Sequence, residues 1–210
     1  MEKVKAYLSC HERDRVPDQE LLFGNKSNFS WNAIYDSFLP YFDNPLSGLD
    51  QVFLADYNGK LLYNFNPVNS SIAKNFDIKL LTPLLNDNLI SYGLHISNKF
   101  KYDPTQKIGK LPLRDLLVKN QADSLISKEK LGFNVNTINL WNSHGHKLCH
   151  EFFDKSRIVE DGWINKEWIE KHIDKSDLDV KYVNKFFGLL AFEIWYRLFI
   201  TKEMNKNEKL

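Results

Sequence analysis

The sequence predicts a mainly α-helical protein, and two observations support this fold class. Few segments after residue 60 alternate apolar and polar residues, which is the pattern of a half-buried strand. Apolar residues recur instead at helical spacing, in segments 31–42, 86–96, 112–120, 139–154, 164–173 and 178–201. We expect these helices to form a single domain over residues 1–201, followed by a polar tail at 202–210.

The composition excludes several classes of protein. Of the 210 residues, 43% are hydrophobic, an ordinary share for a globular chain. The formal net charge of +1 gives no global field that would steer the chain toward nucleic acid or an anionic membrane, so we expect neither partner. The two cysteines, Cys10 and Cys149, are too few for a disulfide framework. Because the N-terminal MEKVKAYLSCHERDR also lacks the apolar run of a signal peptide, we expect a cytoplasmic protein.

The first half of the chain is read as helices and polar connections. Segment 31–42 is expected to be a helix that ends near Pro40, since proline is poor inside a helix. Segment 49–57, LDQVFLADY, is compatible with a helix or a short strand, because periodicity cannot separate the two over so few residues. Residues 58–85 are rich in Asn, Ser and Pro and end in IKLLTPLL, which we expect to be buried.

The closing segment 178–201 is the most apolar of the chain. Charged residues interrupt it, so it falls short of the roughly 20 predominantly apolar residues that a membrane-spanning helix needs. We expect a core helix, with Ser176 or Asp177 as its N-cap. Glu193 and Arg197 have the i, i+4 spacing and the favourable order of a helix ion pair.

The segment GKLPLRDLL, residues 109–117, places a lysine at the start of a helix. Pro112 fits the first helical turn, so the helix is expected to open near Leu111, with Lys110 at its N-terminal end. That end carries positive partial charge, so a lysine there is unfavourable unless an anion lies beside it. Asp115 offsets part of this cost. Lys110 is therefore either a solvated side chain or part of an anion site.

Three segments resemble, in order, the C-terminal half of the synthetase domain of glutamine-dependent asparagine synthetases, a family that includes the β-lactam synthetases. They are FDIKLLTPLLNDNLI (76–90), GKLPLRDLL (109–117) and SKEKLGF (127–133). A closing helix that contains tryptophan, as in AFEIWYRLFI, is also usual for the family. The resemblance covers roughly residues 49–201.

The first two segments keep part of each family motif. The first is similar to Leu-Glu-x-Arg-x-Pro-Phe-Leu-Asp, with Asp77 for the glutamate and Lys79 for the arginine. The second is similar to Lys-x-x-Leu-Arg-Glu, in which Lys110 and Arg114 agree and Asp115 replaces the glutamate.

The third segment is similar to Arg-x-Lys-x-Gly-Phe. Lys130, Gly132 and Phe133 agree with this motif, and Lys128 replaces the arginine. Family members usually add a proline a few residues later, which this sequence lacks.

The resemblance implies a fold and a chemistry. The fold would be the C-terminal helical part of an adenine-nucleotide α-hydrolase-like α/β synthetase domain, the PP-loop ATP pyrophosphatase type. The reaction would use ATP and Mg²⁺ to adenylate the aspartate β-carboxylate, which ammonia from glutamine then converts to the amide. By position Lys110 would be catalytic, since its charge would stabilise the adenylating transition state and the departing pyrophosphate. Arg114, Lys130 and Lys79 would contact phosphate or form internal ion pairs.

Other motifs of the family are absent from the sequence. The phosphate-binding Ser-Gly-Gly-x-Asp-Ser loop does not occur, since no two of the nine glycines are adjacent. In SGLDQ we expect Ser47, Gly48 and Asp50 to form a turn and a helix start. The acidic Gly-Asp-Glu segment is also lacking, and residue 2 is Glu2 where the glutaminase domain has a nucleophilic cysteine.

We therefore expect a chain that is inactive alone. It would need a protein partner that carries the PP-loop half and the glutaminase, and an exposed apolar face should mark where the missing sheet would dock. A truncated fragment, an inactive descendant and a non-catalytic interaction module on the same scaffold remain alternatives.

The segment HGHKLCH, residues 144–150, is a rival candidate for metal binding. His146 and His150 would share a helix face, with His144 and Cys149 close enough to join a site. No second cluster supplies spaced ligands, so we expect a polar helix and no metal site.

Three further patterns have simple explanations. Cys149 beside His150 does not make a nucleophile and base pair, because adjacent helical residues point in different directions. Trp163 and Trp168 are expected to pack rather than to recognise a ligand. A loose group of lysines would suit either nucleic acid or a nucleotide, and it comprises Lys99, Lys101, Lys107 and Lys110 beside Phe100 and Tyr102.

Overall fold

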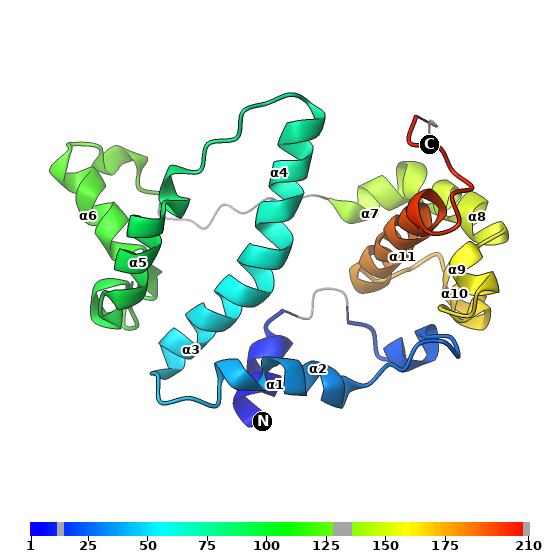
Figure 1. The fold of residues 1–210 in the computed structure, drawn as a ribbon, viewed down its shortest axis with the longest axis horizontal. Helices are drawn as coiled ribbons and strands as arrows, with labels where there is room; N and C mark the ends of the chain where they lie inside the picture. Colours follow the sequence, from blue (N-terminus) through cyan, green and yellow to red (C-terminus); the bar gives the residue numbers. More distant parts are fainter. Residues whose placement is uncertain (12–14, 128–135, 208–210) are drawn as a thin grey trace. The chain divides into compact units, whose positions relative to one another are not determined.

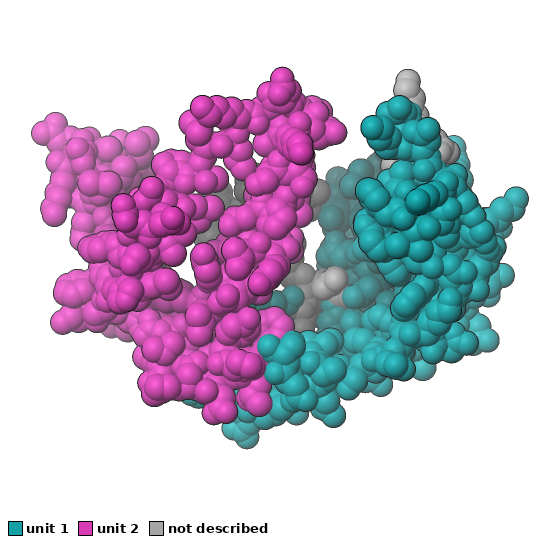
Figure 2. All heavy atoms as spheres, viewed as in Figure 1, with its two compact units in different colours: residues 1–37, 134–210 teal, residues 38–133 magenta. Residues whose placement is uncertain are grey.

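The structure, a computed structural model, describes residues 1–11, 15–127 and 136–207 (Figure 1). The chain divides into two compact units, drawn in different colours in Figure 2. The first unit combines residues 1–37 with 134–210, and the second comprises residues 38–133. Both are mainly helical, as the sequence predicts.

The longest helix of the first unit is α11 (Val180–Phe199), which contributes to the hydrophobic core of this unit. The predicted helix at 139–154 is a continuous run in which a π-helical segment, Trp141–Gly145, joins α7 to α8. The other helices are α1 (Glu2–Ser9), α2 (Trp31–Phe38, its last residue in the second unit), α7 (Thr137–Leu140), α8 (His146–Asp154), α9 (Arg157–Glu160) and α10 (Lys166–His172).

Helix α11 supplies the centre of the hydrophobic core. Its buried residues recur every three or four positions, which turns one stripe of the helix toward its neighbours. The Phe186 ring lies 5.3 Å from Trp141, 5.5 Å from Trp168 and 6.2 Å from Phe153, between ring centroids. A Cβ at Gly145 would lie 2.6 Å from the Phe187 ring, so this close approach requires glycine. In the described part of the chain, no helix has both the length and the apolar character needed to cross a bilayer.

A fully buried carboxylate, Glu193, organises one end of this unit. It accepts hydrogen bonds from the Ser156 hydroxyl at 2.7 Å and from the backbone amides of Arg157 at 2.8 Å and Ile158 at 3.1 Å. It therefore caps α9 from outside that helix. The predicted ion pair with Arg197 is confirmed, and Arg197 also donates to the carbonyls of Phe152 and Lys155.

A second polar network joins the N-terminal segment to the core. Asp18 accepts hydrogen bonds from His172 at 2.7 Å and from the Tyr182 hydroxyl at 3.0 Å, and Lys171 lies 3.3 Å away. Burial alone would raise the pKa of Asp18, but the hydrogen bonds from His172 and Tyr182 outweigh it and lower the pKa to about 2. The backbone of residues 22–26 adds hydrogen bonds to residues 162–165.

The second unit is built on a long helical segment. Helix α3 (Gly48–Ala55) continues through a π-helical stretch, Asp56–Phe65, into α4 (Asn66–Asn75). Residues 49–57, for which the sequence allowed either a helix or a short strand, are thus helical. A short antiparallel pair, β1 (Tyr102–Asp103) and β2 (Ile108–Gly109), separates α5 (Asp87–His95) from α6 (Leu111–Lys119).

Two details of the sequence prediction are wrong. The N-cap of α11 is Asp179, whose side chain accepts from the amide of Lys181, rather than Ser176 or Asp177. The segment IKLLTPLL is exposed along residues 78–85 instead of buried. Its apolar residues lack a covering partner among the described residues of this unit, so their hydrophobicity does not make them part of its core.

Replacement of Glu193 should destabilise the first unit specifically. In Glu193→Gln an amide nitrogen would face donors at a buried position, so we expect the free energy of unfolding to fall by about 2 to 3 kcal/mol. All five tryptophans lie in this unit, so urea unfolding followed by tryptophan fluorescence reports on it alone. Glu151→Gln is the control, because its i, i+4 pair with Lys147 is exposed and should contribute no more than about 0.5 kcal/mol.

The Asp18 network should make stability depend on acid pH. Because the folded-state pKa lies below the usual 3.8, the contribution of Asp18 is complete above that value and is lost as pH falls toward 2. We expect Asp18→Asn to cost about 2 kcal/mol at neutral pH and much less near pH 2, by the same fluorescence assay. If the difference in the free energy of unfolding between the unaltered protein and Asp18→Asn stayed constant from neutral pH to pH 2, the low pKa assigned to Asp18 would be wrong.

Candidate functional site

The start of α6 has the geometry that the GKLPLRDLL segment predicts. Lys110 is the N-cap residue, and Pro112 lies in the first turn. The Lys110 backbone is left-handed, with φ 60° and ψ 34°, a conformation that costs a non-glycine residue roughly 1 kcal/mol or more. The chain needs this turn because β2 ends at Gly109 and α6 begins two residues later.

The backbone at this helix start is already hydrogen bonded. The amide of Leu111 donates to the Lys101 carbonyl at 3.3 Å, and the amides of Leu113 and Arg114 both donate to the Lys110 carbonyl at 3.1 Å. Pro112 has no amide hydrogen. An anion at this helix end would therefore meet the Lys110 side chain and the helix dipole rather than a cradle of free amides.

The side chain of Lys110 is available to a ligand. The residue is exposed, and within the described ranges no ion pair or hydrogen bond is recorded for its ammonium. Lys107 offers a close comparison, because it is also exposed and left-handed, with φ 55°, and it lies in the turn between β1 and β2. The two lysines differ in position, since only Lys110 lies at the helix start.

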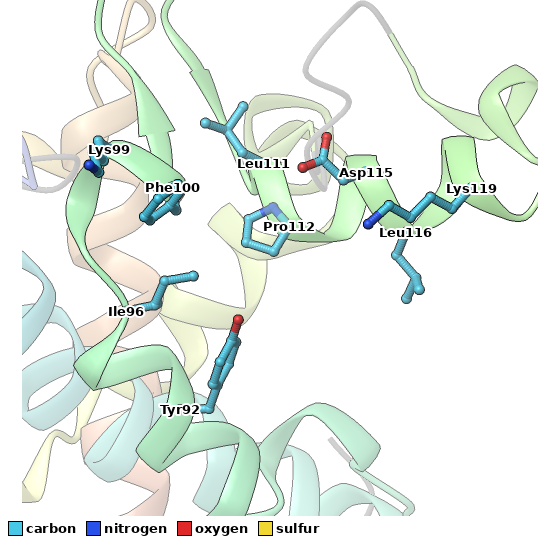
Figure 3. A pocket seen from close by; sticks show the side chains of 9 residues that line it. All are labelled: Tyr92, Ile96, Lys99, Phe100, Leu111, Pro112, Asp115, Leu116 and Lys119. Carbon is cyan, nitrogen blue, oxygen red and sulfur yellow. The ribbon is translucent and has the colours of Figure 1, made fainter.

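A cavity of about 530 Å³ lies between α5 and the first turns of α6, and Figure 3 shows its lining, which begins at Leu111 and does not include Lys110. Leu111 and Pro112 form one wall, and the Tyr92 side chain from α5 points toward them with its hydroxyl (Figure 3). Charged side chains from both sides of the cavity, Lys99 and the Asp115 and Lys119 of α6, join this lining. The remaining lining residues are Ile96, Phe100 and Leu116. The cavity thus combines an apolar wall with two cations and one carboxylate.

The other predicted phosphate-contacting residues lie in different places. The Nε of Arg114 donates to the Gly109 carbonyl at 3.0 Å, so this side chain holds the end of β2 against the first turn of α6. Lys79 is exposed and lines a separate hollow with Lys74 and Asp77. Lys130 lies outside the described residues.

The SGLDQ segment is a helix cap. The Ser47 hydroxyl accepts from the amide of Asp50, which confirms the predicted turn and helix start at α3. Asn98 donates to the same hydroxyl at 2.7 Å, and Lys101 lies 3.7 Å from the Asp50 carboxylate. These contacts tie the β1 side of the unit to α3 and account for one lysine of the basic group.

Cys149 is a core residue. It is fully buried, and burial raises the pKa of its thiol to about 12, so it stays protonated at neutral pH. This state suits neither a nucleophile nor a zinc thiolate. His146 and His150 do share a face of α8, and both contact Asp174. Sequence reasoning missed Asp174, because it is more than 20 residues from either histidine and follows a different helix.

The two predicted packing tryptophans contribute to the core. Trp168 is 2% exposed, and the partly buried Trp163 packs against the core cluster. The Nε1 of Trp163 also donates to the Tyr196 hydroxyl at 3.2 Å.

Both compact units are mainly helical, and comparison with protein families identifies the family of the chain. The asparagine synthase family matches residues 11–197, a range that extends over both compact units. The chain therefore belongs to the asparagine synthase family. Searches of curated proteins and of solved structures found no match.

Removal of the Lys110 side chain should relieve strain. Glycine adopts the left-handed region without penalty, so we expect Lys110→Gly to slow hydrogen exchange of the α6 amides, equivalent to a gain of up to about 1 kcal/mol. Lys110→Val should accelerate exchange. Lys119→Gly, the same change at an ordinary helical position of α6, should cost about 1 kcal/mol and serves as the control.

Proposed function

We propose that this chain supplies the C-terminal part of an ATP-dependent amidoligase of the asparagine synthase type. In this reaction ATP adenylates the β-carboxylate of aspartate, and ammonia derived from glutamine displaces AMP to give asparagine. The observation that carries the proposal is Lys110, an exposed residue at the start of α6, immediately before the turn that lines the cavity. Family membership supports the class of chemistry.

The position of Lys110 at a helix start supports a functional role. Its left-handed backbone does not distinguish it, because Lys107 has the same conformation. A cation there would face the oxygens on which negative charge develops as pyrophosphate leaves. The positive end of the α6 dipole would add to its field.

The cavity at the start of α6 does not fit a Mg²⁺ site. Mg²⁺ takes oxygen ligands in octahedral geometry, whereas the lining offers one carboxylate, Asp115, together with Lys99 and Lys119. We therefore assign Mg²⁺ and most of the ATP contacts to a partner that carries the PP-loop half and the glutaminase.

The surface of the second unit supports a partner of this kind. Large hydrophobic side chains are exposed along α4, the segment after it, and α5, although monomers rarely expose extended apolar patches. The exposed side chains include Val68, Ile72, Phe76, Ile78, Leu80, Leu81, Leu84, Leu85 and Leu89.

The proposed place of the reaction is the cytoplasm, which supplies ATP and aspartate.

Reconstitution with the partner tests the role of Lys110. The chain is purified from its own cells with whatever accompanies it, and aspartate-dependent release of pyrophosphate is measured. We expect Lys110→Asn, which keeps a residue tolerant of the left-handed conformation, to reduce pyrophosphate release by at least about a hundredfold. Binding to the partner should be retained.

Lys107→Asn is the matched control, because it removes a lysine of the same backbone conformation from the turn before β2, away from the helix start. It should leave pyrophosphate release unchanged. Equal loss in both variants, or unchanged release in Lys110→Asn, would refute the catalytic assignment.

The absence of a phosphate loop from the 210 residues favours a second candidate, a non-catalytic interaction module. ATP titrated into the chain alone should bind very weakly under either proposal. The two proposals differ in the protein that should co-purify with the chain. A partner that carries Ser-Gly-Gly-x-Asp-Ser supports the enzyme, whereas a chain that purifies alone supports the interaction module.

A further inference from the structure

We propose that His146, His150 and Asp174 form a binding site for a zinc-type divalent cation on the first unit. The site is separate from Lys110 and independent of the proposed amidoligase reaction. One ligand atom from each of the three residues lies within 4.8 Å of the other two. Three such ligands leave a fourth position for water.

The two histidines converge on one oxygen atom. The Nε2 of His150 lies 2.7 Å from Oδ1 of Asp174, and the Nε2 of His146 lies 3.2 Å from the same oxygen. In a tetrahedral zinc site, bonds of about 2.0–2.2 Å place neighbouring ligand atoms about 3.4 Å apart. Binding of a cation at the centre would therefore move the Asp174 carboxylate away from His150 and bring the three ligand atoms, which lie within 4.8 Å of one another, to about this spacing.

Local structure holds both imidazoles in place. Positions 146 and 150 lie one turn apart on α8, and their ring centroids are 4.7 Å apart. The ring of His146 also packs edge-on against the buried Trp141, with centroids 5.4 Å apart. Asp174 follows α10, so an ion bound to all three residues would link α8 to the end of α10.

The donor set selects the class of metal. Imidazole nitrogen suits zinc and other late first-row divalent ions, whereas Mg²⁺ and Ca²⁺ require oxygen ligands. The site is open to solvent, since the side chains of His146 and His150 are 43% and 45% exposed. A metal can therefore enter without opening the core. Cys149 lies between the two histidines in the sequence, but its side chain is fully buried, so it is not a ligand.

Zinc titration of the untagged full-length chain tests the site. After treatment with a chelator, isothermal titration calorimetry should show one Zn²⁺ bound per chain with micromolar affinity, and Co²⁺ should give the visible absorption of a tetrahedral complex. His146→Ala, His150→Gln and Asp174→Asn should each weaken Zn²⁺ binding at least about tenfold. Mg²⁺ in excess should not compete.

Two control variants keep the test specific. His144→Ala removes an exposed histidine beside the same helix, and Cys10→Ser removes the exposed cysteine next to His11. Both should leave the Zn²⁺ affinity unchanged. Absence of Zn²⁺ binding, unchanged affinity in Asp174→Asn, or an equal loss in His144→Ala would each overturn the proposal. Circular dichroism of each metal-free variant confirms that the comparison is between folded proteins.

Discussion

The first unit depends on the burial of one carboxylate. Glu193 lies on α11, and its oxygens accept from Ser156 and from two amides at the start of α9, while Arg197 supplies the positive charge. A buried carboxylate is tolerated only when such partners surround it. Since α9 has only four residues, its position relative to α11 rests largely on this contact. The hydrophobic core around Phe186 can then pack while α9 and α11 are held together by this contact.

The two units differ in how they satisfy their apolar side chains. The first buries a continuous cluster of aromatic and aliphatic residues around α11, whereas the second exposes many of its leucines and aromatics. Helix propensity and capping, as at Ser47, form the helices of the second unit. Within the described residues of the second unit, these helices lack a common covering surface, which the proposed partner would provide.

Local patterns made much of this structure predictable. Helical periodicity located α5, α6 and α11, and the i, i+4 rule located the Glu193 pair, because both depend on neighbours along one helix. Burial of IKLLTPLL and the N-cap of α11 were predicted wrongly, since both depend on chain geometry that hydrophobicity does not encode. The approach of Asp174 to His146 and His150 was not predictable from local patterns, because only the tertiary structure brings these residues together.

The discontinuity of the first unit has a consequence for synthesis on the ribosome. Asp18 meets partners that follow it by 154 and 164 residues, so its contacts cannot form until nearly the whole chain has been translated. The second unit emerges in between, with its apolar surface uncovered. Nascent chains in this condition are prone to aggregate. Prompt capture of that surface by a chaperone or by the final partner would therefore govern the yield of folded protein.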